Sequence, residues 1–472
     1  MKKCQIPPLT SWILVIALCL SFCGCSTSLS PSTDSAVEKS SQTPLDEYVA
    51  KPDPAFTYDP KPAREDQKDA YTARTYHLVS QEWLDTTKVD RTKWEHWVIV
   101  VIPKEVKYNQ TLLFIGGGGN GGQDVPEADG MLAQVAVMTK SILVEIKQIP
   151  NQPLHFTEEK DEQYKESGRK EDSLIAYGWD KFLVTQDPIW LARLPMTKAV
   201  VRAMDLVQKE YPQITGFFVC GGSKRGWTTW TTAAVDKRVV GIAPAVIDVL
   251  NVAKSLDNHF AAYGFWAPAV GNYDEMHIMD RMHTPEFKAL EAVVDPYSYI
   301  DRLTMPKYII NAAGDQFFPP DSWKFYFDDL KGEKYLRYIP NTDHGLSPEA
   351  YFNMASFYNA VLTNTPRPKF TWSKGADGSL EVRCEDKPTQ VLLWQATNPE
   401  GRDFRLEKIG KAYVSSPAEE TEPGVYRAAI QAPEKGYTAF LLEMEFPNPG
   451  FQSPFKFTTG ISIVPDTYPG AK

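Results

Sequence analysis

The sequence predicts an α/β fold built on a mostly parallel sheet, followed by a smaller β-sandwich domain at the C-terminal side. Between about residues 97 and 362, short apolar runs alternate with amphipathic helical stretches. This alternation is typical of parallel strands that helices cover on both faces. Beyond about residue 366, short strand-like runs lie between Gly, Pro and Asp turns, which favours a sandwich. The length of 472 residues accommodates both domains.

The first domain is predicted over residues 46–365. Its expected strands are short apolar runs that end at a Gly, Pro or polar turn, and its expected helices carry apolar residues on one face. The helix at 197–211 shows this most clearly, with Val200, Met204 and Val207 on one side. In chain order, the expected elements are strands 97–102 and 111–115, helix 127–138, strand 142–146, helix 197–211, strand 217–220, helix 224–235, strands 239–247 and 308–312, helix 321–330, strand 335–339 and helix 348–362.

Two stretches interrupt this alternation. Residues 148–194 are mixed and polar, and residues 248–304 are rich in aromatic side chains and histidine. We expect both to be insertions at one end of the sheet, where helical lids and pockets form. In the second domain, over residues 366–472, strands are expected at 370–372, 380–384, 390–395, 425–430, 438–446 and 460–464, without a helix of useful length.

The first 25 residues have the layout of an export signal. Lys2 and Lys3 precede an apolar run over residues 12–22, which is too short to cross a bilayer comfortably. Gly24-Cys25 resembles a bacterial lipoprotein cleavage site, where the cysteine thiol receives a lipid. The alternative is ordinary secretion without an anchor. We expect an exported protein of the bacterial cell envelope or the extracellular space, which contacts a membrane only through a lipid on Cys25.

A disordered tether is predicted over residues 26–45. Ten of the nineteen residues from 26 to 44 are Ser or Thr, too polar a composition to bury a core. The formal net charge of −10 argues against a nucleic-acid partner held by a basic surface. The sequence has no HExxH motif and no cysteine pair at metal-ligand spacing, so neither a metal site nor a cofactor is predicted. His277 and His283, with Asp274 and Asp280, are better explained as a solvated insert.

The segment FFVCGGSKRG at residues 217–226 carries the strongest chemical signal. A hydrophobic strand runs into Gly-x-Ser and then a helix, the layout of a nucleophile elbow in an α/β-hydrolase-type fold. Ser223 would stand exposed at the end of the sheet as the nucleophile. Arg225 occupies the place of the usual last glycine, and Gly226 follows one position later. The alternative is a glycine-rich turn without a catalytic role.

A carboxylate and a histidine follow the serine in the order that such hydrolases use. Asp315 comes directly after the strand at 308–312, and His344 follows the strand at 335–339. Because the ends of parallel strands meet at one edge of a sheet, the sequence predicts a catalytic triad of Ser223, His344 and Asp315. Asp248 and Asp343 are the alternative acids.

The glycine-rich loop GGGGNGG, residues 116–122, follows its own strand. We expect an oxyanion hole made by the backbone N–H groups of Gly117, Gly118 and Lys224. A phosphate-binding loop is excluded because no Gly-Lys-Ser/Thr ends the motif. A flexible turn is the remaining alternative.

The first insert contains two acidic residues, Glu171 and Asp172, at the start of a helical stretch. Acids are favoured there by the helix dipole, which is the simpler explanation. The sharper hypothesis is that one of them faces the pocket and binds a substrate cation. Aromatic residues near the elbow and in the inserts are expected to lie mostly in the core, with some lining a substrate pocket; they are Trp179, Trp190, Trp227, Tyr263 and Trp266.

Several segments together resemble the PhoPQ-activated pathogenicity-related protein family, whose members are similar to α/β-hydrolases. The resemblance extends from about residue 46 to the C-terminal end, and it implies secretion and a hydrolase-like body. The elbow alone is also similar to that of glucuronoyl esterases. The segments that carry the family resemblance are residues 149–156, 171–183, 194–205, 221–227, 257–266, 311–322 and 340–345.

The sequence therefore predicts a secreted or envelope-anchored serine hydrolase. It would act on a small-molecule ester or peptide substrate through an acyl-enzyme on Ser223. The alternative is a non-catalytic binding or signalling protein of the envelope on a hydrolase scaffold, because a fold does not dictate a function.

Overall fold

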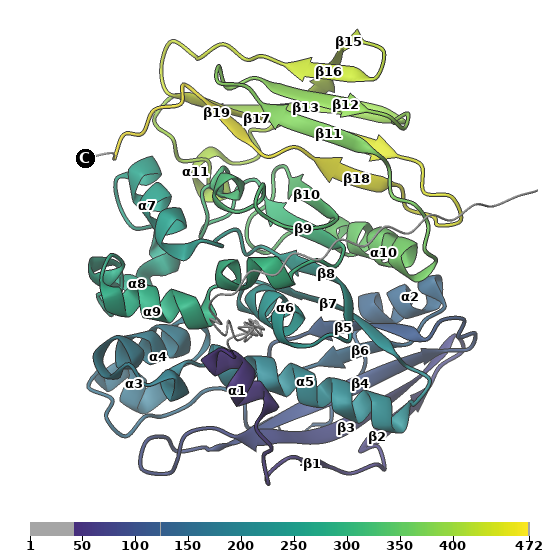
Figure 1. Cartoon of the computed structure of the whole chain (residues 1–472), viewed down its shortest axis with the longest axis vertical. Coiled ribbons are helices and arrows are strands. Elements are labelled where there is room, and N and C mark those ends of the chain that lie inside the picture. Colours follow the sequence, from purple (N-terminus) through teal and green to yellow (C-terminus); the bar gives the residue numbers. More distant parts are fainter. Residues whose placement is uncertain (1–41, 123, 471–472) are drawn as a thin grey trace, which may run out of the picture. The chain divides into compact units, whose positions relative to one another are not determined.

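A computed structural model of the chain describes residues 42–122 and 124–470 (Figure 1). The predicted signal peptide, Cys25 and most of the predicted tether lie outside these residues. The first described helix, α1 (Pro44–Ala50), begins with a capping box in which Thr43 and Asp46 bond to each other's backbone N–H. Residues 43–45, which the sequence assigns to the tether, therefore start a helix.

The centre of the molecule is a parallel sheet of six strands. Antiparallel strands extend it on the N-terminal side. There β4 (Lys93–Pro103) pairs with the first parallel strand, β6 (Leu143–Ile146), and β3 (Tyr71–Glu82) pairs with β4. Two short strands, β1 (Thr57–Tyr58) and β2 (Arg64–Gln67), pair with β3. In spatial order, the parallel strands are β6 (Leu143–Ile146), β5 (Gln110–Ile115), β7 (Gly216–Gly222), β8 (Val239–Ala245), β9 (Lys307–Ala312) and β10 (Lys334–Ile339).

Side chains of each parallel strand alternate between two apolar cores. In β7, Phe217 and Val219 join the core that contains α5 (Arg193–Glu210) and α6 (Lys224–Val235). Phe218 joins the core that contains α2 (Gly130–Thr139) and α10 (Glu349–Leu362). Helices thus cover both faces of the sheet, as Figure 1 shows.

The C-terminal strands do not form a free-standing sheet pair. β18 (Phe455–Thr458) pairs antiparallel with β10, so the central sheet continues into strands that come late in the chain. Those strands are β17 (Tyr437–Phe446), β13 (Gln390–Asn398), β14 (Val414–Pro417) and β19 (Ser462–Val464). A separate antiparallel sheet consists of β11 (Phe370–Lys374), β12 (Leu380–Cys384), β16 (Val425–Ala428) and β15 (Glu419–Glu422).

The two C-terminal sheets share a core, in which Leu380 and Val382 of β12 lie in one apolar cluster with Phe440 and Leu442 of β17. The predicted fold class, an α/β-hydrolase-type sheet with an antiparallel C-terminal region, is therefore confirmed. One short helix, α11 (Leu406–Ile409), lies in this region. The sequence missed it, as it missed β14, β15 and β18.

The two inserts form the helices beside the site. The first contains α3 (Glu162–Ser167), α4 (Glu171–Thr185) and the 3₁₀ turn η1 (Pro188–Trp190). The second contains α7 (Val252–Tyr263), α8 (Gly271–Glu275), α9 (Pro285–Val294) and the 3₁₀ turns η2 (Pro268–Val270), η3 (Met279–Arg281) and η4 (Pro296–Arg302). Within the described ranges, no helix combines the length and the apolar character that crossing a bilayer requires.

One predicted helix is wrong. Residues 321–330 contain only the 3₁₀ turn η5 (Ser322–Phe325). The Lys334 Nζ donates to the carbonyl oxygens of Phe327, Asp328 and Leu330, at 2.7, 2.8 and 3.0 Å. These carbonyls are thereby satisfied without a helix, a tertiary effect that local periodicity does not reveal.

Candidate active site

Ser223 stands at the sharp turn between β7 and α6. Its backbone has φ 58° and ψ −127°, a conformation that L-residues rarely adopt and that costs free energy. The Ser223 N–H donates to the Ala245 carbonyl oxygen at 2.8 Å. A Cβ on Gly226 would lie 2.8 Å from that same oxygen, and one on Gly221 would lie 2.9 Å from the Arg225 carbonyl oxygen. Glycine is therefore needed at 221 and 226 because the strand and helix approach closely.

Arg225, the departure from the usual elbow pattern, joins three parts of the site. Its Nε donates to the Ile149 carbonyl oxygen at 2.6 Å, and its Nη1 donates to Glu171 Oε2 at 2.8 Å. A Cβ on Gly117 would lie 2.7 Å from Arg225 Nη2. Arg225 therefore connects the elbow with the first insert and the glycine-rich loop, which explains an arginine at a position where the sequence alone offered no reason for one.

Asp315 and His344 form a pair on two neighbouring loops, after β9 and β10. The Nδ1 of His344 lies 2.9 Å from each carboxylate oxygen of Asp315, which is 4% exposed. The Phe317 N–H donates to Asp315 Oδ1 at 2.8 Å, and the Phe317 ring lies 4.4 Å from the imidazole. The carboxylate thus accepts the Nδ1 proton and leaves Nε2 without one in the neutral ring.

The alternative acids have other partners. Asp248 accepts hydrogen bonds from the hydroxyls of Tyr326, at 2.6 Å, and Tyr338. Burial raises the pKa of Asp248 to about 7. Asp343 Oδ1 accepts the Gly345 N–H at 2.9 Å. The geometry therefore places Asp315, rather than Asp248 or Asp343, beside His344.

Ser223 and His344 line one pocket, together with Phe114, Tyr351 and Met354. The Nε2 of His344 is buried and has no hydrogen-bond partner among the described residues. No hydrogen bond joins Ser223 to His344 in the part of the chain that the structure describes. Such bonds are often long in unliganded enzymes and tighten when substrate binds.

The glycine-rich loop lies beside the elbow, because Ile115 at the end of β5 pairs with Gly221. Carbonyl groups of the loop are occupied, since Gly117 O accepts the Gln148 N–H at 2.8 Å and Gly118 O accepts Gln152 Nε2 at 3.1 Å. Neither Gly117 nor Gly118 donates its N–H to another described residue. Their role as oxyanion-hole donors, with the Lys224 N–H, stays a prediction.

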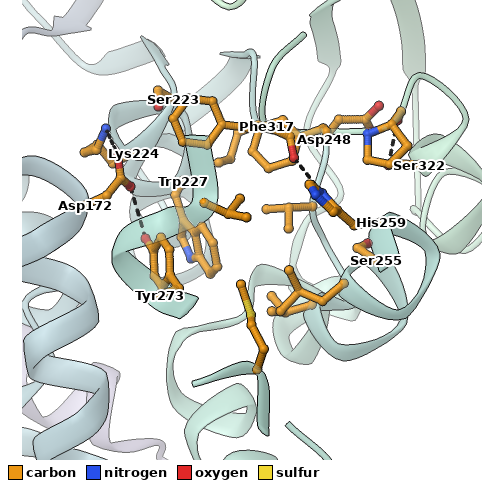
Figure 2. A pocket seen from close by; sticks show the side chains of 18 of the residues that line it. Asp172, Ser223, Lys224, Trp227, Asp248, Ser255, His259, Tyr273, Phe317 and Ser322 are labelled. Carbon is orange, nitrogen blue, oxygen red and sulfur yellow. Dashed lines mark hydrogen bonds and ion pairs between the residues drawn. The ribbon is translucent and has the colours of Figure 1, made fainter. Parts of the chain in front are cut away.

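A second, largely apolar pocket adjoins Ser223 and is lined on one side by residues of the second insert. Figure 2 shows its two polar ends. On one side, Asp172 lies 2.8 Å from the Lys224 Nζ and accepts a hydrogen bond from the Tyr273 hydroxyl at 3.1 Å. On the other side, the His259 Nδ1 lies 3.2 Å from the Phe317 carbonyl oxygen. Apolar side chains line the space between them, including Trp179, Trp227, Val252, Leu256 and Met279.

Glu171 and Asp172, the predicted substrate-binding acids, pair with the start of α6. Glu171 contacts Arg225, and it lies 3.1 Å from the Lys224 Nζ. Burial raises the pKa of Glu171, but the hydrogen bonds and charge of Arg225 outweigh burial and lower this pKa to about 2. Binding of a substrate cation by either carboxylate stays a prediction, and these pairs reduce the negative charge available for it.

Other predicted residues lie apart from the elbow or in the core. His277 contacts Asp280 and His283 contacts Asp257, each at 3.1 Å, so the two histidines share no carboxylate. No cluster of three or more His, Cys, Asp or Glu suited to a metal ion occurs within residues 42–122 and 124–470. Of the aromatic residues, Trp179 and Trp227 line the pocket, whereas Trp190, Tyr263 and Trp266 do not.

Sequence reasoning missed two residues of the site. Gln152 donates to Glu171 Oε1 at 2.6 Å and accepts the Glu171 N–H at 2.7 Å. Arg193, the first residue of α5, lines the apolar pocket. Both lie in the first insert. Gln152 falls within residues 149–156, a segment of family resemblance, but no chemical motif marks either residue, and only their tertiary contacts reveal them.

A comparison with family models agrees with the resemblance noted in the sequence. A family model described as PhoPQ-activated pathogenicity-related protein matches residues 45–405. Autocrine proliferation repressor protein A of Dictyostelium discoideum is 36% identical over 461 residues, 90% of this chain and 91% of that protein. Acetyl esterase Axe7A of Xylanibacter ruminicola is 27% identical over 156 residues, 33% of each protein. Among solved structures, acetyl xylan esterase 1 from Thermoanaerobacterium sp. has a TM-score of 0.46 and 15% identity, covering 67% of this chain and 93% of that one.

Proposed function

The chain belongs to the PhoPQ-activated pathogenicity-related protein family, and from this premise we propose that it is a serine hydrolase acting on small ester or peptide substrates. The observation that carries the proposal is the pairing of His344 Nδ1 with Asp315, which leaves an unpartnered Nε2 in the pocket that Ser223 also lines. The strained backbone of Ser223 adds support, because such strain concentrates at functional positions.

In the proposed reaction, Ser223 Oγ attacks the substrate carbonyl carbon while His344 Nε2 accepts the hydroxyl proton. Asp315 holds the imidazole and stabilises its positive charge. The developing oxyanion accepts hydrogen bonds from the N–H groups of Gly117, Gly118 and Lys224. The leaving alcohol or amine departs with the proton from His344, and a water molecule then hydrolyses the acyl-enzyme by the same steps in reverse.

Esters are the first substrates to examine. A relative over a third of the chain is named an acetyl esterase, which favours ester over peptide cleavage. The apolar pocket beside Ser223 would receive one side of the scissile bond.

Turnover measurements test the proposal. Purified protein should hydrolyse 4-nitrophenyl esters, aminoacyl-arylamides or both, and Ser223→Ala should abolish this activity while the thermal unfolding midpoint stays unchanged. The neighbouring Ser255→Ala, which alters a pocket-lining hydroxyl outside the proposed triad, is the matched control and should retain turnover. If Ser223→Ala kept the turnover of the wild type, Ser223 would be excluded as the nucleophile.

A second candidate is a non-catalytic binding or signalling protein on the same scaffold. The relative with 36% identity is named a proliferation repressor, which favours this alternative. The two candidates differ in one outcome. If the second is right, Ser223→Ala leaves the biological effect of the protein intact.

Export and anchoring are part of the proposal. The N-terminal sequence favours an exported protein that a lipid on Cys25 attaches to the bacterial envelope. Full-length protein expressed in bacteria should incorporate labelled palmitate and fractionate with membranes, and Cys25→Ser should lose both properties. A Cys25→Ser variant that still incorporates label would exclude this site of lipidation.

A further inference from the structure

Arg193 is a buried cation that lacks a carboxylate partner. The residue is 2% exposed, and its Nη1 donates to the Lys224 carbonyl oxygen at 2.8 Å. The guanidinium carbon lies 4.3 Å from the centre of the Trp227 ring, and Nε is buried with no hydrogen-bond partner. Among the described residues, no Asp or Glu lies within ion-pair distance of this guanidinium. A buried charge in this state is costly and calls for an explanation.

The other buried arginines show what is missing. Arg169 pairs with Glu159, Arg337 with Glu443, Arg402 with Asp321 and Arg405 with Asp403. Each of these four is also at most 3% exposed. Within the described ranges, Arg193 is thus the buried arginine whose charge the protein leaves without a carboxylate.

The carboxylates nearest to Arg193 are already committed. Asp172 contacts Lys224, and Glu171 contacts both Lys224 and Arg225, so two anions face two cations in this cluster. Burial lowers the pKa of Arg193 to about 10, which still leaves the guanidinium protonated at neutral pH. The positive charge of Arg193 is therefore in excess at this end of the pocket.

The second carboxylate of this pocket is also unavailable. Asp248 accepts hydrogen bonds from two tyrosine hydroxyls, those of Tyr326 and Tyr338, and forms no ion pair with Arg193. The Tyr273 hydroxyl, which faces the same cluster, donates to Asp172. Neither group neutralises the guanidinium.

Arg193 also lies close to the proposed nucleophile. It bonds to the carbonyl of Lys224, the residue that follows Ser223, and Arg193 and Ser223 line the same apolar pocket. An anionic group bound by this guanidinium would lie in a pocket whose lining is largely apolar. Charge-assisted hydrogen bonds are strongest in such surroundings, and the Arg193 Nη2 makes no hydrogen bond to any described residue, whereas Nη1 is occupied by the Lys224 carbonyl.

We infer that Arg193 binds a carboxylate carried by the substrate, so that the enzyme prefers esters with a negatively charged group close to the scissile bond. This inference rests on the proposed serine hydrolase function and adds a substrate class to it. The single excess positive charge favours a monoanion such as a carboxylate. The expected substrate group is therefore an anion, whereas the acidic residues Glu171 and Asp172 suggested a cation from the sequence.

The test compares substrates that differ only in charge. In the first pair, the carboxylate or the neutral carboxamide that replaces it lies on the acyl side. The two compounds are the 4-nitrophenyl monoester of adipic acid and the 4-nitrophenyl ester of adipamic acid. A second pair carries it on the alcohol side, 3-carboxyphenyl butyrate against 3-carbamoylphenyl butyrate. The quantity measured is the ratio of kcat/KM for the anionic and neutral member of each pair, corrected for spontaneous hydrolysis. A ratio within one variant does not depend on the fraction of folded enzyme.

Wild type should favour the anionic member of at least one pair by about tenfold or more. In Arg193→Met, the ratio for that pair should fall to about one, and Arg193→Lys should retain part of the preference. Arg337→Met, which removes a buried arginine away from the pocket, is the matched control and should keep the wild-type ratio.

The outcomes separate the inference from the function on which it rests. Turnover with equal rates for charged and neutral members in wild type would overturn the inference alone. A preference that survives in Arg193→Met would also overturn it, because another group would then bind the anion. If neither member of any pair is hydrolysed, the proposed function fails and the inference fails with it.

Discussion

The two halves of the candidate site are held in place by different parts of the chain. The nucleophile half is local: Ser223 lies between β7 and α6, and the close approach of Gly221 and Gly226 to neighbouring backbone fixes its strained conformation. The acid–base half, Asp315 and His344, lies on two loops that the C-terminal region contacts. The first half is marked by a contiguous motif, residues 217–226, which packs against Ala245 of the next strand. The second half brings together two loops and C-terminal residues that lie far apart in the sequence.

Three contacts tie the C-terminal region to the acid–base loops. The Leu406 N–H donates to the Gly314 carbonyl oxygen at 2.9 Å, next to Asp315. The Asn341 side chain bonds to both the N–H and the carbonyl of Tyr413, at 3.0 and 2.9 Å. Arg402 Nη2 bonds to Asp321 at 2.9 Å. The C-terminal region therefore contacts the loops that carry Asp315 and His344, and we expect changes in it to affect activity more than their distance from Ser223 would suggest.

The largest effect should come from breaking the acid–base half directly. His344→Ala should lower kcat for ester hydrolysis by roughly 10⁴-fold or more, because the variant has no imidazole to accept the proton. Asp315→Asn should lower kcat by about 10⁴-fold, because the imidazole is then held in the wrong tautomer. Steady-state kinetics with a 4-nitrophenyl ester measures both effects. Asp343→Asn changes the neighbouring carboxylate, which does not bond to the ring, and should retain most of the activity. A comparable loss of kcat in Asp343→Asn would contradict the assignment of Asp315 as the acid of the triad.

The next effect sharpens the comparison by weakening the C-terminal support. Arg402→Met leaves the buried Asp321 with Lys324 as its remaining cationic partner, and we expect the free energy of unfolding to fall by about 3 kcal/mol. The kcat should also fall by about tenfold or more at a temperature where the variant is folded, since small displacements of catalytic groups are costly.

The matched control for this change is Arg337→Met. Arg337 is equally buried and also joins the central sheet to the C-terminal strands, through Glu443 of β17. It does not bond to the loops that carry Asp315 and His344. Chemical denaturation and kcat measured together should show a similar loss of stability but unchanged kcat for Arg337→Met. Equal loss of kcat in both variants would show that general destabilisation, not loop support, explains the effect.

A smaller effect is expected at the nucleophile half. In Gly226→Ala, the new Cβ would lie 2.8 Å from the Ala245 carbonyl oxygen, so the free energy of unfolding should fall by about 1–3 kcal/mol. Thermal unfolding measures this change. In Gly271→Ala the new methyl meets nothing within 4 Å, so that control should be neutral or slightly stabilising. A neutral Gly226→Ala would contradict the close approach of α6 to β8.

The smallest effect concerns Asp248, which belongs to neither half. Burial raises its pKa from 3.8 to about 7, so the folded protein keeps this proton over a pH range in which the unfolded chain has released it. The free energy of unfolding should therefore fall as the pH rises from about 4 to 7. In Asp248→Asn this contribution is absent, so the difference in stability between the variant and wild type should change across that range. A constant difference would contradict a buried, protonated Asp248.

The same division explains what the sequence predicted. A contiguous motif predicts Ser223, and Asp315 and His344 are predicted because each follows a parallel strand at the shared edge of the sheet. Arg193, Gln152 and the C-terminal contacts carry no local signal, because their roles depend on partners brought together by folding. The prediction of a helix at 321–330 was wrong for a related reason, since Lys334 donates to the Phe327 carbonyl, which a helix would otherwise use.

The central claim, that Ser223 is a nucleophile activated by His344, is tested most directly by active-site labelling. Folded protein is incubated with a fluorophosphonate, and the intact mass and the modified peptide are determined. The proposal predicts one adduct per chain, located on Ser223, and its loss in both Ser223→Ala and His344→Ala. The claim would be contradicted if folded wild-type protein formed no adduct, or if the Ser223→Ala variant still formed it.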